Sequence, residues 1–151
     1  MNKFTSLLII FLILMPLSIQ GYDISSWLDE DSIVYEQPEP NTWIIPYNSS
    51  QGGTISVGVL SVEEKWIMIM VPLFELPDEY PSQAFMQLAQ ANYQMNQMKL
   101  GLSEENYIFL QMEIPYRLVN KQELIDNIEF IAYAVDENLE TIASWFGLSL
   151  E

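Results

Sequence analysis

The 151-residue sequence contains no cysteine and no histidine. Without cysteine the chain can form no disulfide framework, no thiolate zinc site and no cysteine nucleophile. Without histidine it lacks the commonest general base, the serine–histidine dyad and most transition-metal sites. The glycine pair in Gln51-Gly52-Gly53 has neither the lysine nor the second glycine of a phosphate loop. We therefore predict no enzymatic activity, no catalytic residues, no metal and no cofactor, with a carboxylate-based hydrolase as the alternative.

Basic residues are also scarce, with 5 Lys and Arg against 21 Asp and Glu and a formal net charge of −16. The first 21 residues hold Lys3 and no acid, so the remainder carries 4 − 21 = −17. A surface with this charge repels nucleic acid and anionic membranes, which proteins bind mainly through Lys and Arg. It suits a basic partner, and it also serves simply to keep a protein in solution. We predict no nucleic-acid partner.

The N-terminal segment, residues 1–21, has the features of a signal peptide. Lys3 provides a positive start, residues 7–15 form an apolar run, and Pro16 interrupts it. The run is short for a membrane span, which takes about 20 residues. We predict cleavage near Gly21, with an uncleaved membrane anchor as the alternative. Residues 22–151 then form a single domain in the periplasm or outside the cell. In a eukaryotic secretory pathway, Asn48 would head a glycosylation sequon.

Residues 80–114 form the centre of the predicted domain. Pro81 is placed to begin a helix at residues 80–97, in which Phe85, Leu88 and Asn92 share one stripe. A short strand at residues 99–102 and a turn follow. Apolar residues then alternate through residues 107–114, the pattern of a strand with one buried face.

The rest of the chain provides further strands and two more helices. Asn120 with Glu123 resembles a capping box, and Gly147 is placed to end the last helix. The apolar seam of that helix predicts either core or a dimer interface. We predict an α+β fold with a mostly antiparallel sheet in the order α-β-β-β-β-α-β-β-α. The remaining predicted elements are a helix at residues 22–31, an apolar run at 33–35 followed by a loop at 37–40, strands at 42–47, 54–60 and 66–71, and the helix at 120–146.

The strand at residues 66–71 is unusual because both of its faces are apolar. Trp66, Met68 and Met70 alternate with Ile67, Ile69 and Val71. One interpretation is a central strand covered by helices on both sides. The other is that the Trp66, Met68 and Met70 face is partly open and binds an apolar peptide or a second copy, since methionine adapts to varied partners.

An ordered set of motifs resembles the YbjN-like family and, more distantly, the type III secretion chaperones. The motifs are WIMIMVPLFELP, LAQANYQMNQMKLGL, YIFLQMEIP and NKQELIDNIEFI, within residues 54–146. The resemblance implies a compact α+β domain that binds polypeptide or pairs with itself and has no enzymatic activity. Secretion chaperones work in the cytosol, whereas this chain opens with an export signal, so the role of escorting a secretion substrate is not carried over.

Together these observations predict an exported, non-enzymatic protein that binds a polypeptide or a second copy of itself. Trp66, Met68 and Met70 are the predicted contact residues. Contact with a membrane is expected only through residues 1–21, if that segment stays attached. A structural envelope or surface protein without a ligand is the second alternative, beside the carboxylate hydrolase.

Overall fold

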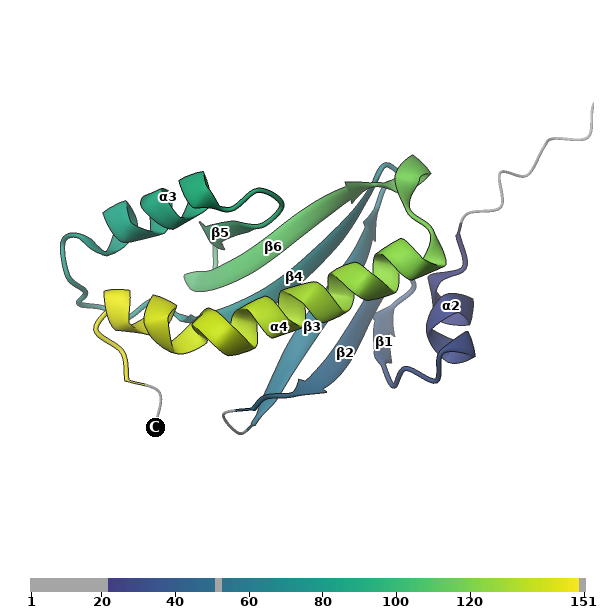
Figure 1. The fold of residues 1–151 in the computed structure, drawn as a ribbon, viewed down its shortest axis with the longest axis horizontal. Coiled ribbons are helices and arrows are strands. Elements are labelled where there is room, and N and C mark those ends of the chain that lie inside the picture. The colour runs from purple at the N-terminus through teal and green to yellow at the C-terminus, as the bar shows by residue number, and fades with distance from the viewer. Residues whose placement is uncertain (1–21, 51–52, 150–151) are drawn as a thin grey trace, which may run out of the picture.

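The structure is a computed structural model that describes residues 22–50 and 53–149. The predicted signal segment lies outside these described residues. One antiparallel sheet has the strand order β1-β2-β3-β4-β6-β5, and α4 runs diagonally across it (Figure 1). The elements are α2 (Ile24–Glu30), β1 (Glu36–Glu39), β2 (Thr42–Asn48), β3 (Thr54–Val62), β4 (Trp66–Glu75), α3 (Ala84–Gln94), β5 (Lys99–Leu102), β6 (Tyr107–Pro115) and α4 (Lys121–Trp145). The predicted α+β class and the predicted order of elements are confirmed.

The helix α4 begins and ends where the sequence predicts. The Asn120 side chain accepts a hydrogen bond from the backbone N–H of Glu123 at 3.0 Å, which satisfies one of the free donors at the helix start. At the other end Gly147 takes a φ of 77°, and the Leu148 N–H donates to the Ala143 carbonyl at 3.1 Å. Glycine adopts this left-handed conformation without strain, so it ends the helix cleanly.

The apolar seam of α4 belongs to the core. Ile128, Ile131 and Val135 are at most 1% exposed, and α4 lies against β3, β4 and β6. The strands contribute the other half of this core through residues of alternate positions, as in Ile67 and Ile69 of β4. Of the two readings of the seam, core or dimer interface, the structure therefore shows the first.

Phe146 joins three elements at the far end of α4. It is 1% exposed, and its ring centroid lies 5.6 Å from that of Phe74, 5.6 Å from that of Phe85 and 6.1 Å from that of Tyr80. These edge-to-face contacts connect the end of β4, the start of α3 and the end of α4. Aromatic pairs in this geometry add to the stabilisation from buried area.

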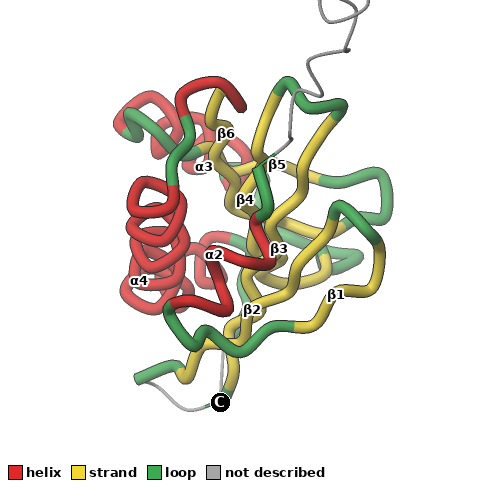
Figure 2. Tube along the Cα trace, turned by 90° about the vertical axis from the view of Figure 1, so that its right-hand side faces the viewer, coloured by secondary structure: helices red, strands yellow, loops and turns green. Residues whose placement is uncertain are grey.

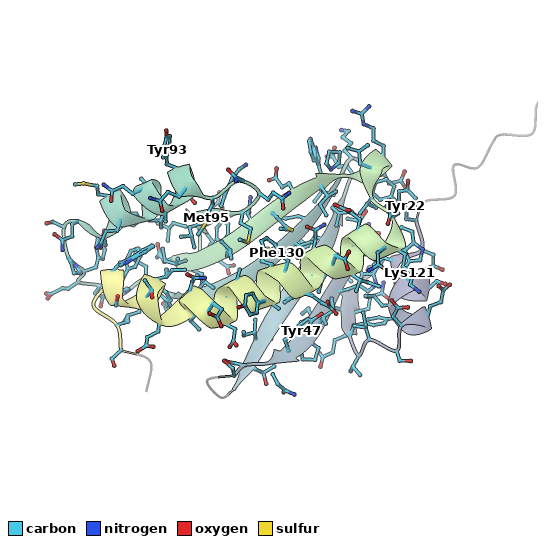
Figure 3. All side chains as sticks on the ribbon, viewed as in Figure 1. Tyr22, Tyr47, Tyr93, Met95, Lys121 and Phe130 are labelled. Atoms are coloured by element: carbon cyan, nitrogen blue, oxygen red, sulfur yellow. The ribbon has the colours of Figure 1, made fainter. Side chains whose placement is uncertain are left out.

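The helix α3 is shorter than predicted. Pro81 lies in a turn, whose carbonyl accepts from the Ala84 N–H at 2.9 Å, and the helix begins only at Ala84. The predicted stripe is met in part: Leu88 is buried, whereas Phe85 is 37% exposed. Tyr93 is 91% exposed and projects away from the molecule (Figure 3).

Asn92 of that stripe holds β5 in place. Its side-chain oxygen accepts from the Leu100 N–H at 2.7 Å, and its amide donates to the Leu100 carbonyl at 2.8 Å. The side chain thus pairs with β5 as a neighbouring strand would. We expect Asn92→Ala to lower the free energy of unfolding by about 2 kcal/mol, because two half-buried backbone groups lose their partner. Urea denaturation measures this, with exposed Asn96→Ala as the control that should change little.

The prediction of a loop at residues 37–40 is wrong in part, because Glu36–Glu39 forms the edge strand β1. It pairs with β2, with Glu36 opposite Ile44 and Glu39 opposite Thr42. Pro38 is tolerated there because an edge strand has one side on which no N–H is needed. Within the described residues no helix is both long enough and apolar enough to cross a membrane.

Candidate functional site

The two apolar faces of β4 have different surroundings. Ile67, Ile69 and Val71 are at most 2% exposed and lie under α4, whereas Trp66 is 45% exposed and Met68 and Met70 are half-buried. Figure 2 shows α2 and α4 on one side of the sheet. Among the described residues no helix covers the opposite side of β4. The interpretation with helices on both sides is therefore wrong for this part of the chain.

We call the side that carries Trp66, Met68 and Met70 the open face. Residues directly opposite each other on neighbouring strands share a face, so each of these three residues has a neighbour on β3 and one on β6 that belong to the open face. Met70 lies between Gly58 and Gln111, Met68 between Leu60 and Glu113, and Trp66 between Val62 and Pro115. The three predicted contact residues thus sit together on one apolar surface that continues across β3.

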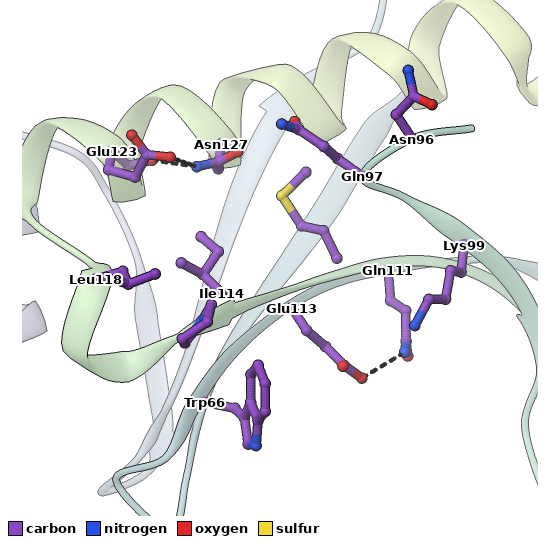
Figure 4. Close-up of a pocket in the computed structure, with 12 residues that line it drawn as sticks. Trp66, Asn96, Gln97, Lys99, Gln111, Glu113, Ile114, Leu118, Glu123 and Asn127 are labelled. Atoms are coloured by element: carbon purple, nitrogen blue, oxygen red, sulfur yellow. Dashed lines mark hydrogen bonds between the residues drawn. The ribbon is translucent and has the colours of Figure 1, made fainter. Parts of the chain in front are cut away.

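A cleft lies where the open face meets the edge of β6. It has a volume of about 420 Å³ and opens between the loop before β5, the end of β6 and the first turns of α4 (Figure 4). Its lining is Trp66, Asn96, Gln97, Lys99, Gln111, Met112, Glu113, Ile114, Pro115, Leu118, Glu123 and Asn127. Of the predicted contact residues only Trp66 reaches this cleft. No pattern in the sequence predicts the cleft, because it depends on where β5 begins relative to the end of β6.

The two carboxylates in the cleft do not converge on one point. Glu113 accepts a hydrogen bond from the Gln111 amide at 3.1 Å, and Glu123 accepts one from the Asn127 amide at 3.3 Å. In Figure 4 these pairs lie on different walls of the cleft. A carboxylate hydrolase needs two carboxyl groups flanking one bond of the substrate. Within the described residues no three acidic side chains are grouped to hold a metal ion, and no charged residue is buried.

The groups with shifted pKa values serve other parts of the fold. Hydrogen bonds to Asp31 and then to Glu30 raise the pKa of Lys121, which ties α2 to the start of α4. Burial, followed by the nearby charge of Glu129, raises the pKa of Tyr47. None of these residues lines the cleft.

Asp136 fastens the tip of the β2–β3 hairpin to α4. The Ser49 hydroxyl donates to its carboxylate, and the Ser50 N–H donates to the same group at 3.1 Å. These bonds, that from Ser49 first, lower the pKa of Asp136 below its usual 3.8. The carboxylate therefore stabilises the fold at pH values above about 3.8, and this contribution disappears as the pH falls through the lowered pKa.

We expect Asp136→Asn to be less stable than wild type at neutral pH and to approach it in acid. Urea denaturation across a pH series measures the difference between the two proteins. Glu137→Gln, at an exposed position of the same helix, is the control. A difference between Asp136→Asn and wild type that stays constant down to pH values well below 3.8 would contradict this assignment.

Comparison with known proteins gives no match to a family model and no match to a curated protein by sequence. Solved structures do match. A chain of the Yersinia pestis type III secretion chaperone SycH in complex with a YscM2 fragment has a TM-score of 0.54 and 11% identity, covering 77% of this chain and 95% of that one. A chain of the ExoU–SpcU complex from the type III secretion system of Pseudomonas aeruginosa gives 0.55 and 14%, covering 78% and 94%.

This chain shares its fold with type III secretion chaperones. An uncharacterized protein from Methanothermobacter thermautotrophicus also matches, with a TM-score of 0.50 and 19% identity over 82% of this chain and 96% of that one. Identities this low establish the fold alone. The resemblance to secretion chaperones is thus confirmed at the level of fold, whereas the resemblance to the YbjN-like family stays a prediction.

Proposed function

We propose that this is an exported, non-enzymatic protein that binds a polypeptide segment on the open face of its sheet. The observation that carries the proposal is the exposure of Trp66 beside half-buried Met68 and Met70, on a strand whose other face is fully buried. An apolar surface left uncovered on an otherwise acidic protein is typical of an interaction site.

The chemistry of the open face favours a polypeptide over a small ligand. Methionine side chains are flexible and polarisable, and tryptophan supplies a large contact area at low entropic cost. The face extends over three strands, whereas sites for small molecules are usually concave pockets. Support also comes from the structural neighbours, since SycH was solved bound to a fragment of another protein.

Export remains part of the proposal. It rests on Lys3 and the apolar run at residues 7–15, and it places the domain in the periplasm or outside the cell. The escort role of cytosolic secretion chaperones does not follow from the shared fold. N-terminal sequencing of the protein from its native compartment tests export, and we expect a new N-terminus near residue 22.

A matched pair of lysine substitutions tests the binding surface. We expect Met70→Lys to weaken capture of short synthetic peptides from an immobilised library by about tenfold, or ~1.4 kcal/mol, because a charge is placed in the middle of an apolar contact. Met86→Lys introduces the same change on α3 at a residue that is 62% exposed, and it should leave binding unchanged.

Three outcomes would contradict the proposal. Equal binding by both variants would remove the open face from the site. If no peptide shows saturable binding, the alternative of a structural envelope or surface protein without a ligand would be favoured. A stable dimer by light scattering that Met70→Lys converts to monomer would show that a second copy, and not a partner polypeptide, occupies the face.

A further inference from the structure

Part of the β6 edge has no neighbouring strand. β5 has four residues and pairs with Ile108–Gln111, whereas β6 continues to Pro115. Before β5 the chain bends at Asn96 and Gln97 and so leaves the edge of β6. On that side, no strand of the described chain pairs with residues 112–115. This free edge is the floor of the cleft in Figure 4.

The backbone of the free edge is available for pairing. The Tyr116 N–H donates to the Lys65 carbonyl at 2.9 Å, toward β4. Since successive residues of a strand direct their N–H and C=O groups to opposite sides, Glu113 presents both of its groups away from β4, along the free edge. Pro115 also faces outward, which agrees with its lack of an N–H. One residue of an added strand can therefore form a pair of hydrogen bonds with Glu113.

Both walls of the cleft suit the side chains of an added strand. Residues of a strand alternate between the two faces of the sheet. On the open face an added side chain meets Trp66 and Glu113, and on the α4 side it meets Ile114 and Leu118. The first wall combines a carboxylate with an exposed aromatic ring, which attract a Lys or Arg side chain. On the second wall Ile114 and Leu118, the latter 61% exposed, lie beside the Glu123–Asn127 pair.

Charge selects among occupants of the edge. Glu113 and Glu123 line the cleft, and Lys99 is the one base of its lining, at the end next to Gln111 (Figure 4). Beyond Trp66 the surface continues to Lys65, whose ammonium is paired with Glu63 at 2.7 Å, and to Arg117. A second copy would bring like carboxylates together on chains that each carry −17 outside the first 21 residues. A basic segment of a partner avoids this repulsion.

We infer that the free edge of β6, residues 112–115, takes up an extended segment of a partner polypeptide in which basic and apolar side chains alternate. The segment extends the sheet by one strand, with its basic side chains toward Glu113 and Trp66 and its apolar side chains toward Ile114 and Leu118. This rests on the proposed polypeptide binding, and it names the chemistry of the segment and the edge that holds it.

A synthetic peptide of alternating valine and lysine, about eight residues long, is the probe. Fluorescence anisotropy of the labelled peptide with the purified chain should show saturable binding that weakens as salt is added. The matched valine–glutamate peptide should not bind. Methylation of the peptide backbone nitrogens keeps the charge and the side chains but removes the donors, and we expect it to weaken binding about tenfold or more.

Two protein measurements locate the site. Glu113→Gln should weaken binding about threefold, as expected for an exposed ion pair. Glu123→Gln, on the wall that the apolar side chains face, should weaken binding less. Glu105→Gln, which removes one charge from an exposed turn away from the cleft, should have no effect. Amide hydrogen exchange at the Glu113 N–H should slow when the peptide is bound, since that donor becomes hydrogen-bonded.

The outcomes separate this inference from the proposed function. If the methylated peptide binds equally well while Met70→Lys abolishes binding, the edge is not the site and the open face stands. If methylation and Glu113→Gln weaken binding while Met70→Lys does not, the peptide binds at the free edge of β6, and the proposal of binding on the open face is wrong. If no peptide binds, both the proposed binding on the open face and the inferred binding at the free edge are wrong. Slow exchange at Glu113 in a dimer without peptide would assign the edge to a second copy and overturn the inference.

Discussion

Ile69→Ala should lower the free energy of unfolding by about 3 kcal/mol, the range found for large-to-small changes in a packed core. Ile69 is 0% exposed and lies under α4, so alanine leaves a cavity that the rigid strand cannot close. Met70, the next residue, lies on the open face, and Met70→Ala should cost about 1 kcal/mol or less, because the methionine retains contact with water.

The pair is informative because the two large apolar residues are neighbours on one strand and lie on opposite faces of the sheet. Urea denaturation of both variants and of wild type gives the two differences. Met112→Ala, buried at 4% exposure on β6, is a third variant that should behave like Ile69→Ala. Equal losses at Ile69 and Met70 would mean that both faces of β4 are covered, which would remove the surface on which the proposed function depends.

Phe146→Ala should be at least as damaging, with a loss of about 4 kcal/mol. The ring is 1% exposed and makes edge-to-face contacts with Phe74, Tyr80 and Phe85. Its removal opens a cavity and also releases the start of α3 from the end of α4. We therefore expect faster amide exchange in α3 before exchange rises in the central strands.

Phe130→Ala is the matched control, because Phe130 is on the outer side of the same helix and is 46% exposed. Its loss should change the free energy of unfolding by less than about 1 kcal/mol. Thermal and urea denaturation measure stability, and amide exchange measures the local effect. A Phe146→Ala protein in which α3 stays as protected as in wild type would show that the aromatic contacts do not hold that helix.

The long-range architecture could be predicted from the sequence where burial imposes a period. Ile128, Ile131 and Val135 recur at helical spacing because one face of α4 must lie against the sheet. Ile108, Leu110 and Met112 alternate because β6 is covered on one side only. Asn120 and Gly147 act through local geometry, which the sequence carries directly.

Other elements could not be predicted because their side chains carry no burial signal. All four residues of β1 are exposed, so only its backbone pairing with β2 makes it a strand. The helix α3 begins only at Ala84, and Tyr80, before the turn at Pro81, contacts Phe85 and Phe146 instead of lying in the helix. The contact with Phe146 joins residues that are distant in the sequence, so no local pattern predicts it.

The candidate site, too, could be predicted from the sequence only in part. The sequence identified Trp66, Met68 and Met70 as one apolar face, but their exposure depends on which side of the sheet the helices occupy. The cleft exists because β6 is longer than β5 and extends past it. How far one strand extends past its neighbour depends on how the two pair, and composition does not reveal it. Whether these three residues contact a partner stays a prediction for the variants described above.

The position of α4 along the chain has a consequence for how the protein is made. The sheet's central strands are complete at Pro115, yet Ile67 and Ile69 are covered by a helix that extends to Trp145. During synthesis these side chains meet water until α4 has emerged. Burial of the core face of the sheet must therefore wait for α4, and the partly made chain is prone to aggregation during that interval.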